Sequence, residues 1–316
     1  MTVIARTDRH RRLVRREALT ALPFLLPWLL GLVLFFVYPL LATVALSFAQ
    51  YDQFNPPQFV GIQNWIYVLS QYRPFGQALG NTVILILLMV PSSTIFALVT
   101  GMVVMRLRRG AGVFRTLFYL PYLAPPVAAT LAFVFLLSPR GALNQFLALV
   151  GIEGPKWFND PATAKIALTL LTLWGIGNLM VIFLAALLDV PQEQYEASSL
   201  DGAGPIAQFW YITLPALRPI VLFSVITGVI ATMQYYTQAI VAGRVASGQS
   251  IGPGTGFVPG YPGGSTLTLP QLIYSFGFQN FDVGSASVVA VIMMAIALAL
   301  TATLLRRGSA FLGEGE

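Results

Sequence analysis

The chain has 316 residues, of which 56% are hydrophobic and only 9% are charged, and its formal net charge is +6. Soluble domains contain roughly 25% charged residues, so this composition excludes a protein dissolved in water and predicts a membrane protein. The absence of cysteine excludes disulfides, thiolate chemistry and cysteine-based metal sites. Because the arginines cluster beside apolar runs, membrane topology accounts for the positive charge better than nucleic-acid binding does.

Six apolar runs are long enough to cross a bilayer, which needs about 20 residues. A cleaved signal peptide is the competing interpretation of the first run, but that run is far longer than the roughly 7–15 apolar residues of a signal peptide. Prolines break the first three runs and predict kinks there, because each removes a backbone donor. The six runs are Leu19–Phe48, Thr82–Met105, Thr116–Leu137, Ile166–Leu188, Ile220–Ala242 and Ala286–Leu305, and the prolines are Pro23, Pro27, Pro39, Pro91, Pro121, Pro125 and Pro126.

The distribution of Lys and Arg predicts the orientation, because short cytosolic loops are enriched in both residues. Both termini and the loop around Glu196 are therefore expected on the cytosolic side. The richer side holds Arg6, Arg9, Arg11, Arg12, Arg15, Arg16, Arg106, Arg108, Arg109, Arg115, Arg218, Arg306 and Arg307. The poorer side holds Arg73, Arg140, Lys156, Lys165 and Arg244.

Three outer loops differ in character. The segment 51–73 predicts a short amphipathic helix with Trp65 and Tyr67 at the membrane interface, and Ser138–Pro161 offers further aromatic anchors. The stretch Ala242–Pro270 is rich in Gly, Pro and Ser, which predicts a flexible or loosely ordered loop.

The predicted spans contain no Asp, Glu, Lys, Arg or His. Ion-driven carriers commonly keep such residues at membrane depth, although backbone carbonyls can bind sodium. The chain also lacks the phosphate-binding loop of a nucleotide hydrolase. A transporter with this sequence is therefore expected to receive its energy from a partner.

The stretch Pro191–Pro215 is polar and acidic although apolar runs lie on both sides of it. Pro191 suits a first helical position, and Glu193 and Glu196 suit the start of a helix, which favours negative charge. Gly202 allows a turn, and Gly204-Pro205 begins a second helix. We expect a thin, acidic, exposed helix that can enter a groove on another protein.

This stretch resembles the EAA loop of bacterial ABC-importer permeases, with one departure at Ser198, where the family pattern has Ala. The alternative is a plain polar connector between spans. Weaker landmarks of sugar-type permeases are Phe59–Trp65, Asn81-Thr82, Arg115–Pro121 and Tyr274–Phe278. The residues that match the loop pattern are Glu196, Ala197, Ser198, Asp201, Gly202, Ala203, Ile212, Leu214 and Pro215.

The resemblance implies the transmembrane fold of a type I importer, near the maltose and glycerol-3-phosphate branch. It implies a homologous second permease subunit, an ATPase dimer and an extracytoplasmic solute-binding protein as partners, all acting at the bacterial inner membrane. The matched loop would dock in a cleft of the ATPase. No cofactor is expected in this chain, because ATP and magnesium would be bound by the partner ATPase.

Polar residues within the spans are candidates for a substrate pathway, since amides and phenols can hydrogen-bond to sugar hydroxyls. The alternative role is helix–helix hydrogen bonding. An anionic substrate would need Arg or Lys, which the spans lack, so a neutral sugar is favoured. The candidates are Asn178, Gln234, Tyr235, Tyr236 and Gln238.

The sequence thus predicts an all-α, six-span permease subunit of an ATP-driven sugar importer, not an enzyme. The expected division is a basic tail, first span and outer loop over residues 1–76, a transmembrane domain over 77–306 and a cytosolic tail over 307–316. Two alternatives remain. A self-sufficient secondary carrier or channel would transport without partners, and a membrane scaffold or sensor would tolerate changes at Gly202.

Overall fold

The computed structural model describes residues 23–107, 109–249 and 259–312. The basic tail, the first four residues of the predicted first span, Arg108 and the C-terminal residues 313–316 lie outside the described part. So does the centre of the Gly- and Pro-rich loop, residues 250–258.

The described chain is mostly helical, and its strands form one antiparallel hairpin of β1 (Ala49–Gln50) and β2 (Gln58–Phe59). In chain order the helices up to the centre are η1 (Val33–Val37), α2 (Tyr38–Leu46), α3 (Gln63–Ile66), η2 (Tyr67–Gln71), α4 (Arg73–Met105), α5 (Ala111–Tyr119), η3 (Leu120–Leu123), α6 (Pro126–Leu136), α7 (Ala142–Leu149), η4 (Trp157–Asn159), α8 (Pro161–Trp174) and α9 (Gly177–Leu188). The remainder are α10 (Gln192–Leu200), α11 (Pro205–Gln208), η5 (Phe209–Thr213), α12 (Leu214–Ala216), α13 (Arg218–Met233), α14 (Thr237–Ala246), α15 (Leu269–Tyr274), η6 (Ser275–Gln279) and α16 (Val283–Leu312).

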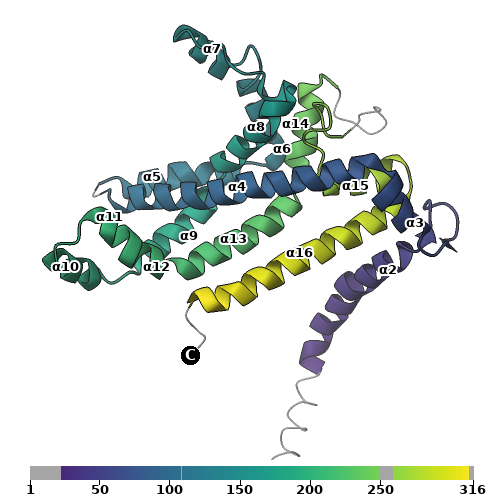
Figure 1. The fold of residues 1–316 in the computed structure, drawn as a ribbon, viewed down its shortest axis with the longest axis horizontal. Helices are drawn as coiled ribbons and strands as arrows, with labels where there is room; N and C mark the ends of the chain where they lie inside the picture. The colour runs from purple at the N-terminus through teal and green to yellow at the C-terminus, as the bar shows by residue number, and fades with distance from the viewer. Residues whose placement is uncertain (1–22, 108, 250–258, 313–316) are drawn as a thin grey trace, which may run out of the picture.

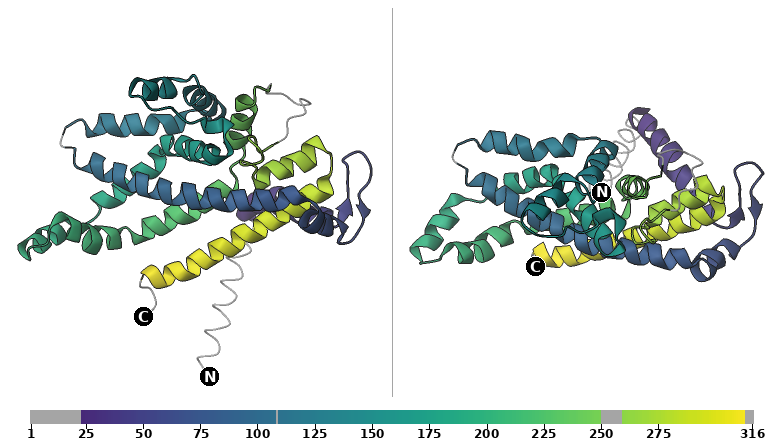
Figure 2. Two further views of the ribbon diagram at one scale, coloured as in Figure 1. Left: turned by 45° about the horizontal axis from the view of Figure 1, so that its top comes forward. Right: turned by 90° about the horizontal axis from the view of Figure 1, so that it is seen from above.

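Long apolar helices dominate the architecture. Three of them are long and apolar enough to cross a bilayer, namely Pro23–Leu46, α4 and Val283–Arg306. Three further pairs meet the same test only together, because each pair bends at a short break. The longest helix, α4, contacts α8, α9, α13 and α15, so it forms the centre around which the other helices pack (Figures 1 and 2).

The prolines act differently in different helices. A wide π-helical turn, η1, ends two residues before Pro39, which fits the expected disturbance. Pro91 lies inside α4, which continues without interruption on both sides of it. The break between α5–η3 and α6 lies at Pro125 and Pro126, where the chain turns by 100°.

Two other spans bend where the proline pattern gave no prediction. The pair α8 and α9 bends by 55° at Gly175 and Ile176, and the pair that ends in α13 bends by 65° at Leu217. The predicted fifth run, Ile220–Ala242, is wrong as one continuous helix, because α13 ends at Met233 and α14 begins at Thr237. An apolar run predicts that a segment lies in the bilayer, but contacts with neighbouring helices decide where its helix is interrupted.

The expectation of a loose loop over Ala242–Pro270 is wrong for its described parts. Its first residues belong to α14, and the residues before α15 are packed inside the protein. Asn81 of α4 donates hydrogen bonds to the carbonyls of Gly264 (2.8 Å) and Leu267 (3.0 Å). Backbone groups of a Gly-rich segment can therefore be satisfied by a distant helix, which composition alone does not reveal.

The outer segment before α4 forms the predicted short helix, as α3 continued by η2. Trp65 in this helix donates from Nε1 to Ser47 Oγ at 3.3 Å, so its indole holds α3 to the end of the first span.

The helix ends gather at two ends of the molecule. The segment α10–α12 protrudes at one end, together with the C-terminal end of α4 and the start of α5, whereas α3 and α15 lie at the other end (Figure 1). The sequence had placed the loops of these two ends on opposite sides of the membrane.

Candidate functional site

The acidic loop folds as the predicted short helix, α10, at the protruding end of the molecule (Figure 1). Pro191 precedes the helix instead of occupying its first position, a correction of one residue. Glu193 lies in the first turn, and Glu193, Glu196 and Asp201 are all exposed. The carboxylates are therefore available to a partner.

Gly202 ends this helix with a left-handed turn. Its φ is +82°, a region that costs other residues energy because of their Cβ. The amide of Gly202 donates to the carbonyl of Ser199 (3.1 Å), and the amide of Ala203 donates to that of Ser198 (2.9 Å). These two bonds form the Schellman motif, which satisfies the last carbonyls of a helix. The glycine in the loop pattern is thus explained by backbone conformation.

Large apolar side chains surround the acidic residues on this loop. Leu200 is 91% exposed, Ile206 77% and Tyr211 82%. Exposed apolar side chains next to charged ones are typical of a surface that contacts another protein. By contrast, Ile212, Leu214 and Pro215 are half-buried, so the second half of the loop pattern anchors the loop to the protein.

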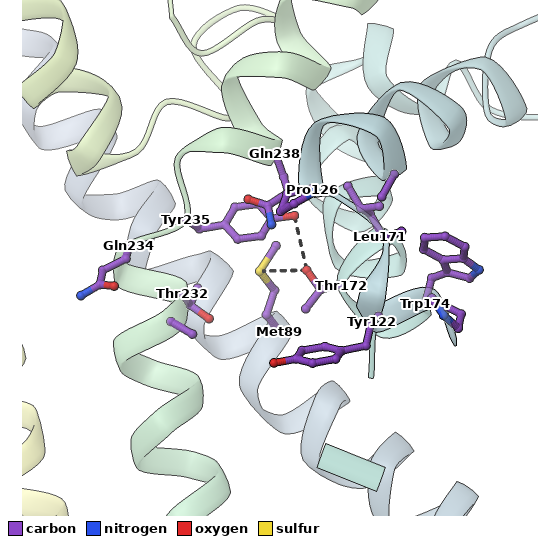
Figure 3. Close-up of a pocket in the computed structure, with 15 residues that line it drawn as sticks. Met89, Tyr122, Pro126, Leu171, Thr172, Trp174, Thr232, Gln234, Tyr235 and Gln238 are labelled. Carbon is purple, nitrogen blue, oxygen red and sulfur yellow. Dashed lines mark hydrogen bonds between the residues drawn. The ribbon is translucent and has the colours of Figure 1, made fainter. Parts of the chain in front are cut away.

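A second candidate site is a cavity of about 510 Å³ inside the helix assembly (Figure 3). It lies where three spans are interrupted, between η3 and α6, between α8 and α9, and between α13 and α14. Discontinuous helices are the usual construction of substrate sites in transporters. The cavity is lined by Met89, Pro121, Tyr122, Ala124, Pro126, Ala129, Leu171, Thr172, Trp174, Gly175, Ala231, Thr232, Gln234, Tyr235 and Gln238.

The polar centre of this cavity joins two spans. Thr172 of α8 donates from Oγ1 to the Tyr235 phenol oxygen at 3.4 Å, and it also lies 3.8 Å from the sulfur of Met89 (Figure 3). Tyr235 is only 8% exposed and donates to the carbonyl of Leu168 at 3.4 Å. Gln238 of α14 lines the same cavity (Figure 3). Together these groups offer hydrogen bonds and an aromatic ring to one ligand.

The structure brings together three of the five residues predicted for a substrate pathway. Gln234, Tyr235 and Gln238 line the cavity, although the Gln234 amide points away from the Thr172–Tyr235 pair (Figure 3). Asn178 is exposed on α9 outside the cavity lining, and the ring of Tyr236 packs against that of Tyr274 with centroids 5.4 Å apart. These two side chains belong to other surfaces.

Sequence reasoning missed Thr172, Trp174 and Tyr122, which also line the cavity. A usable signal was present, because Trp174 precedes two closely spaced glycines in the middle of an apolar run. Glycines there indicate an interrupted helix, and a polar or aromatic residue at the interruption can face the opening.

Among the described residues, no charged side chain lines this cavity. Within residues 23–107, 109–249 and 259–312, no group of three or more His, Asp or Glu residues is close enough to hold a metal ion. An apolar hollow of about 540 Å³ lies beside the cavity and shares Pro121 and Trp174 with it. Trp174, whose ring lies 5.4 Å from that of Phe133, therefore forms part of the wall between the two spaces.

Comparison with known proteins identifies the family. The family described as binding-protein-dependent transport system inner membrane component matches residues 93–310, which include the acidic loop and every residue that lines the cavity except Met89. The chain belongs to this family. It is a permease subunit of an ABC transporter, and the membrane scaffold or sensor is set aside.

Relatives of known name resemble this permease over nearly its whole length. The lactose transport system permease protein LacF of Rhizobium radiobacter is 31% identical over 86% of this chain and 89% of its own. The sulfoquinovosyl glycerol transport system permease protein SmoG of Agrobacterium fabrum (strain C58) is 30% identical over 92% of this chain and 90% of its own.

A solved structure shows the same fold. In the bacterial alginate ABC transporter crystallised with its alginate pentasaccharide-bound periplasmic protein, one chain matches this permease with a TM-score of 0.78. The match covers 95% of this permease and 97% of that chain, at 18% sequence identity. The expected fold of an ABC-importer permease is thereby confirmed.

Proposed function

We propose that this permease forms the translocation pathway of an importer for saccharides and is driven by a partner ATPase that docks on α10 and α11. The observation that carries the proposal is the loop of α10–α12, which protrudes at one end of the molecule and exposes carboxylates and apolar side chains there. A second permease subunit, an ATPase dimer and an extracytoplasmic binding protein complete the assembly.

The proposed topology has six spans, with both termini and the α10 loop in the cytosol. The fifth span is α13, and the segment Pro205–Ala216 that bends into it lies at its cytosolic end. Up to six spans are compatible with helix length and composition. The distribution of Lys and Arg supports this orientation. The proposed division keeps the basic tail, first span and outer loop in residues 1–76 and the transmembrane domain in 77–306, although both boundaries fall inside helices, α4 and α16.

The substrate class is supported by the chemistry of the cavity. Its volume of about 510 Å³ falls within the range of about 300–1,000 Å³ for small-molecule sites. Amide, hydroxyl and phenol groups lie next to aromatic rings, which suits a sugar with hydroxyls on its edges and C–H groups on its faces. The relatives are named for neutral and anionic sugars alike. The uncharged lining favours a neutral one.

The proposed mechanism is alternating access. ATP binding closes the ATPase dimer and displaces the α10 loop, and the spans reorient about their breaks so that the cavity opens to the other side of the membrane. The chain itself makes and breaks no covalent bond. No cofactor is needed here, because the partner ATPase holds the nucleotide and its magnesium.

The decisive experiment is gentle purification of the tagged permease from its native membrane, followed by identification of the proteins that accompany it. A second permease and a soluble ATPase would support the proposal. A chain that emerges alone, even after mild cross-linking, would contradict it. The self-sufficient carrier would then be the better interpretation, and transport by the purified chain in liposomes would test it.

A further inference from the structure

The α10 loop folds back on itself and is held in that shape by one side chain. Gln208, the last residue of α11, donates from Nε2 to the carbonyl of Tyr195 (3.2 Å), to Ser198 Oγ (3.0 Å) and to Ser199 Oγ (2.9 Å). All three acceptors belong to α10, between Tyr195 and Ser199. The amide therefore joins two helices that only the short Gly202 turn otherwise connects.

A second hydrogen bond holds α10 in place. The Tyr195 phenol and the Thr213 hydroxyl lie 2.9 Å apart, and Thr213 is buried at the end of η5. Tyr195, Gln208 and Thr213 also line a small cavity of about 90 Å³ against the C-terminal end of α4. Two side-chain contacts thus tie α10 to α11 and to η5, and the three side chains face the C-terminal end of α4.

The attachment leads directly into the core. Phe209, which follows Gln208, packs against an apolar cluster that contains Leu217 and Ile176. Leu217 lies at the bend before α13, and Ile176 lies at the bend after α8, next to the cavity residue Gly175. A displacement of a rigid α10–η5 unit would therefore reach both bends.

We propose that Gln208 is a positioning residue that clamps α10 to α11 and η5, so that the loop moves as one rigid body and transmits its displacement to α13. The inference rests on the proposed docking of an ATPase on this loop, and it adds the element that makes the docked loop stiff. Without the clamp, a push on α10 would be absorbed by the Gly202 turn.

The chain has no native cysteine, so spin labels can be attached to introduced cysteines alone. We would label Gln194→Cys on α10 and Ala216→Cys on α12, both exposed positions before the bend at Leu217, in the assembled transporter in lipid nanodiscs. The distance distribution between the labels is measured without nucleotide and with ATP and vanadate. The clamp predicts a narrow distribution that is the same in both states.

Gln208→Met keeps the length of the side chain but removes its donors, and the narrow distribution should then be lost. Gln208→Lys retains donors and should restore it. The matched control is Gln192→Met, because Gln192 donates only to Glu196 Oε1 (2.9 Å) within α10 and should leave the distribution narrow.

A Gln208→Met distribution identical to that of the parent would overturn the clamp. So would a parent distribution that changes between the two nucleotide states, because the unit would then not be rigid. If no ATPase accompanies the chain, the proposed function fails instead. The same labels on the isolated permease would still report whether Gln208 narrows the distribution.

Discussion

At the scale of single residues, the side chains that face the cavity differ in what holds them. Tyr235 is buried and hydrogen-bonded to α8, whereas Gln238 is half-buried and no described hydrogen bond occupies its amide. A buried phenol with partners already contributes to packing, but an amide beside the cavity can give its hydrogen bonds to a ligand. The two residues are therefore expected to respond differently to substitution.

Gln238→Ala should weaken uptake through substrate affinity. Loss of one or two hydrogen bonds to a ligand corresponds to about a tenfold rise in KM with a smaller change in the maximal rate. Uptake kinetics of the identified sugar in whole cells measure this. The Gln234 amide points away from the Thr172–Tyr235 pair, so Gln234→Ala should reduce uptake less. Equal effects of the two variants would contradict the assignment of Gln238 as a substrate contact.

Tyr235→Ala should reduce uptake and also loosen the contact between α8 and the interrupted fifth span. Tyr235→Phe separates the two effects, because it keeps the ring and loses only the phenol contacts at 3.4 Å. We expect the Phe variant to retain assembly with its partners and most of its thermal stability. Unchanged uptake in both variants would remove Tyr235 from the pathway.

Gly202→Val should abolish coupled uptake although the protein still assembles in the membrane. The space around Gly202 is open, with no heavy atom within 4 Å of an added Cβ, so the cost comes from its positive φ. That cost is about 1–2 kcal/mol for an ordinary residue. Asn tolerates this conformation better, so Gly202→Asn should keep much of the activity. Equal loss in both variants would point to a docking role for the bare glycine.

At the scale of elements, the breaks in the spans require close approach of backbones. A Cβ on Gly177, at the start of α9, would overlap the carbonyl oxygen of Phe118 in α5. Because α5 and α9 meet here through main-chain atoms, a side-chain rotation cannot relieve the overlap. The bend after α8 is thus fixed partly by a residue that has no side chain.

Gly177→Ala should therefore destabilise the permease by about 1–3 kcal/mol, the usual cost of overpacking. Thermal unfolding in detergent, followed by the loss of monodisperse protein, measures the effect. Gly112→Ala in α5 is the matched control, since no heavy atom lies within 4 Å of its added Cβ, and it should be neutral or slightly stabilising. A melting temperature unchanged by Gly177→Ala would show that the contact yields without cost.

At the scale of the whole molecule, most apolar surface faces outward. The apolar window of the first helix, Pro23–Leu46, is 0% buried within this chain, and that of Val283–Arg306 is 11% buried. Such surfaces are stable only against lipid or another apolar protein surface. These helices therefore face lipid or another apolar surface, and the orientation of the chain in the bilayer can be tested directly.

The cysteine-free sequence also allows the topology to be measured. With Ala148→Cys on α7, a membrane-impermeant maleimide should label intact spheroplasts. With Gln194→Cys on α10, labelling should occur only after the membrane is opened. The opposite pattern would invert the proposed orientation and exclude an ATPase on the α10 loop.

The sequence alone determined the class of this protein, its apolar runs and its acidic loop. The reason is that the preference of a segment for lipid or water depends on its own residues. About 20 consecutive apolar residues require lipid, and a helix with charged residues requires water or a partner. The structure bears out the helical class, and the resemblance in the loop led to the correct family. These properties depend on residue type and spacing within one segment.

The tertiary structure decided where the spans break and which polar side chains meet. Thr172 and Tyr235 are separated by 63 residues, and Asn81 satisfies carbonyls more than 180 residues away. Hydropathy carries no information about such contacts, so the bend at Gly175 was missed. The bend at Leu217 was missed although Pro215 and Pro219 flank it. For the same reason Asn178 and Tyr236 could not be separated from Gln238 until the helices were packed around a common cavity.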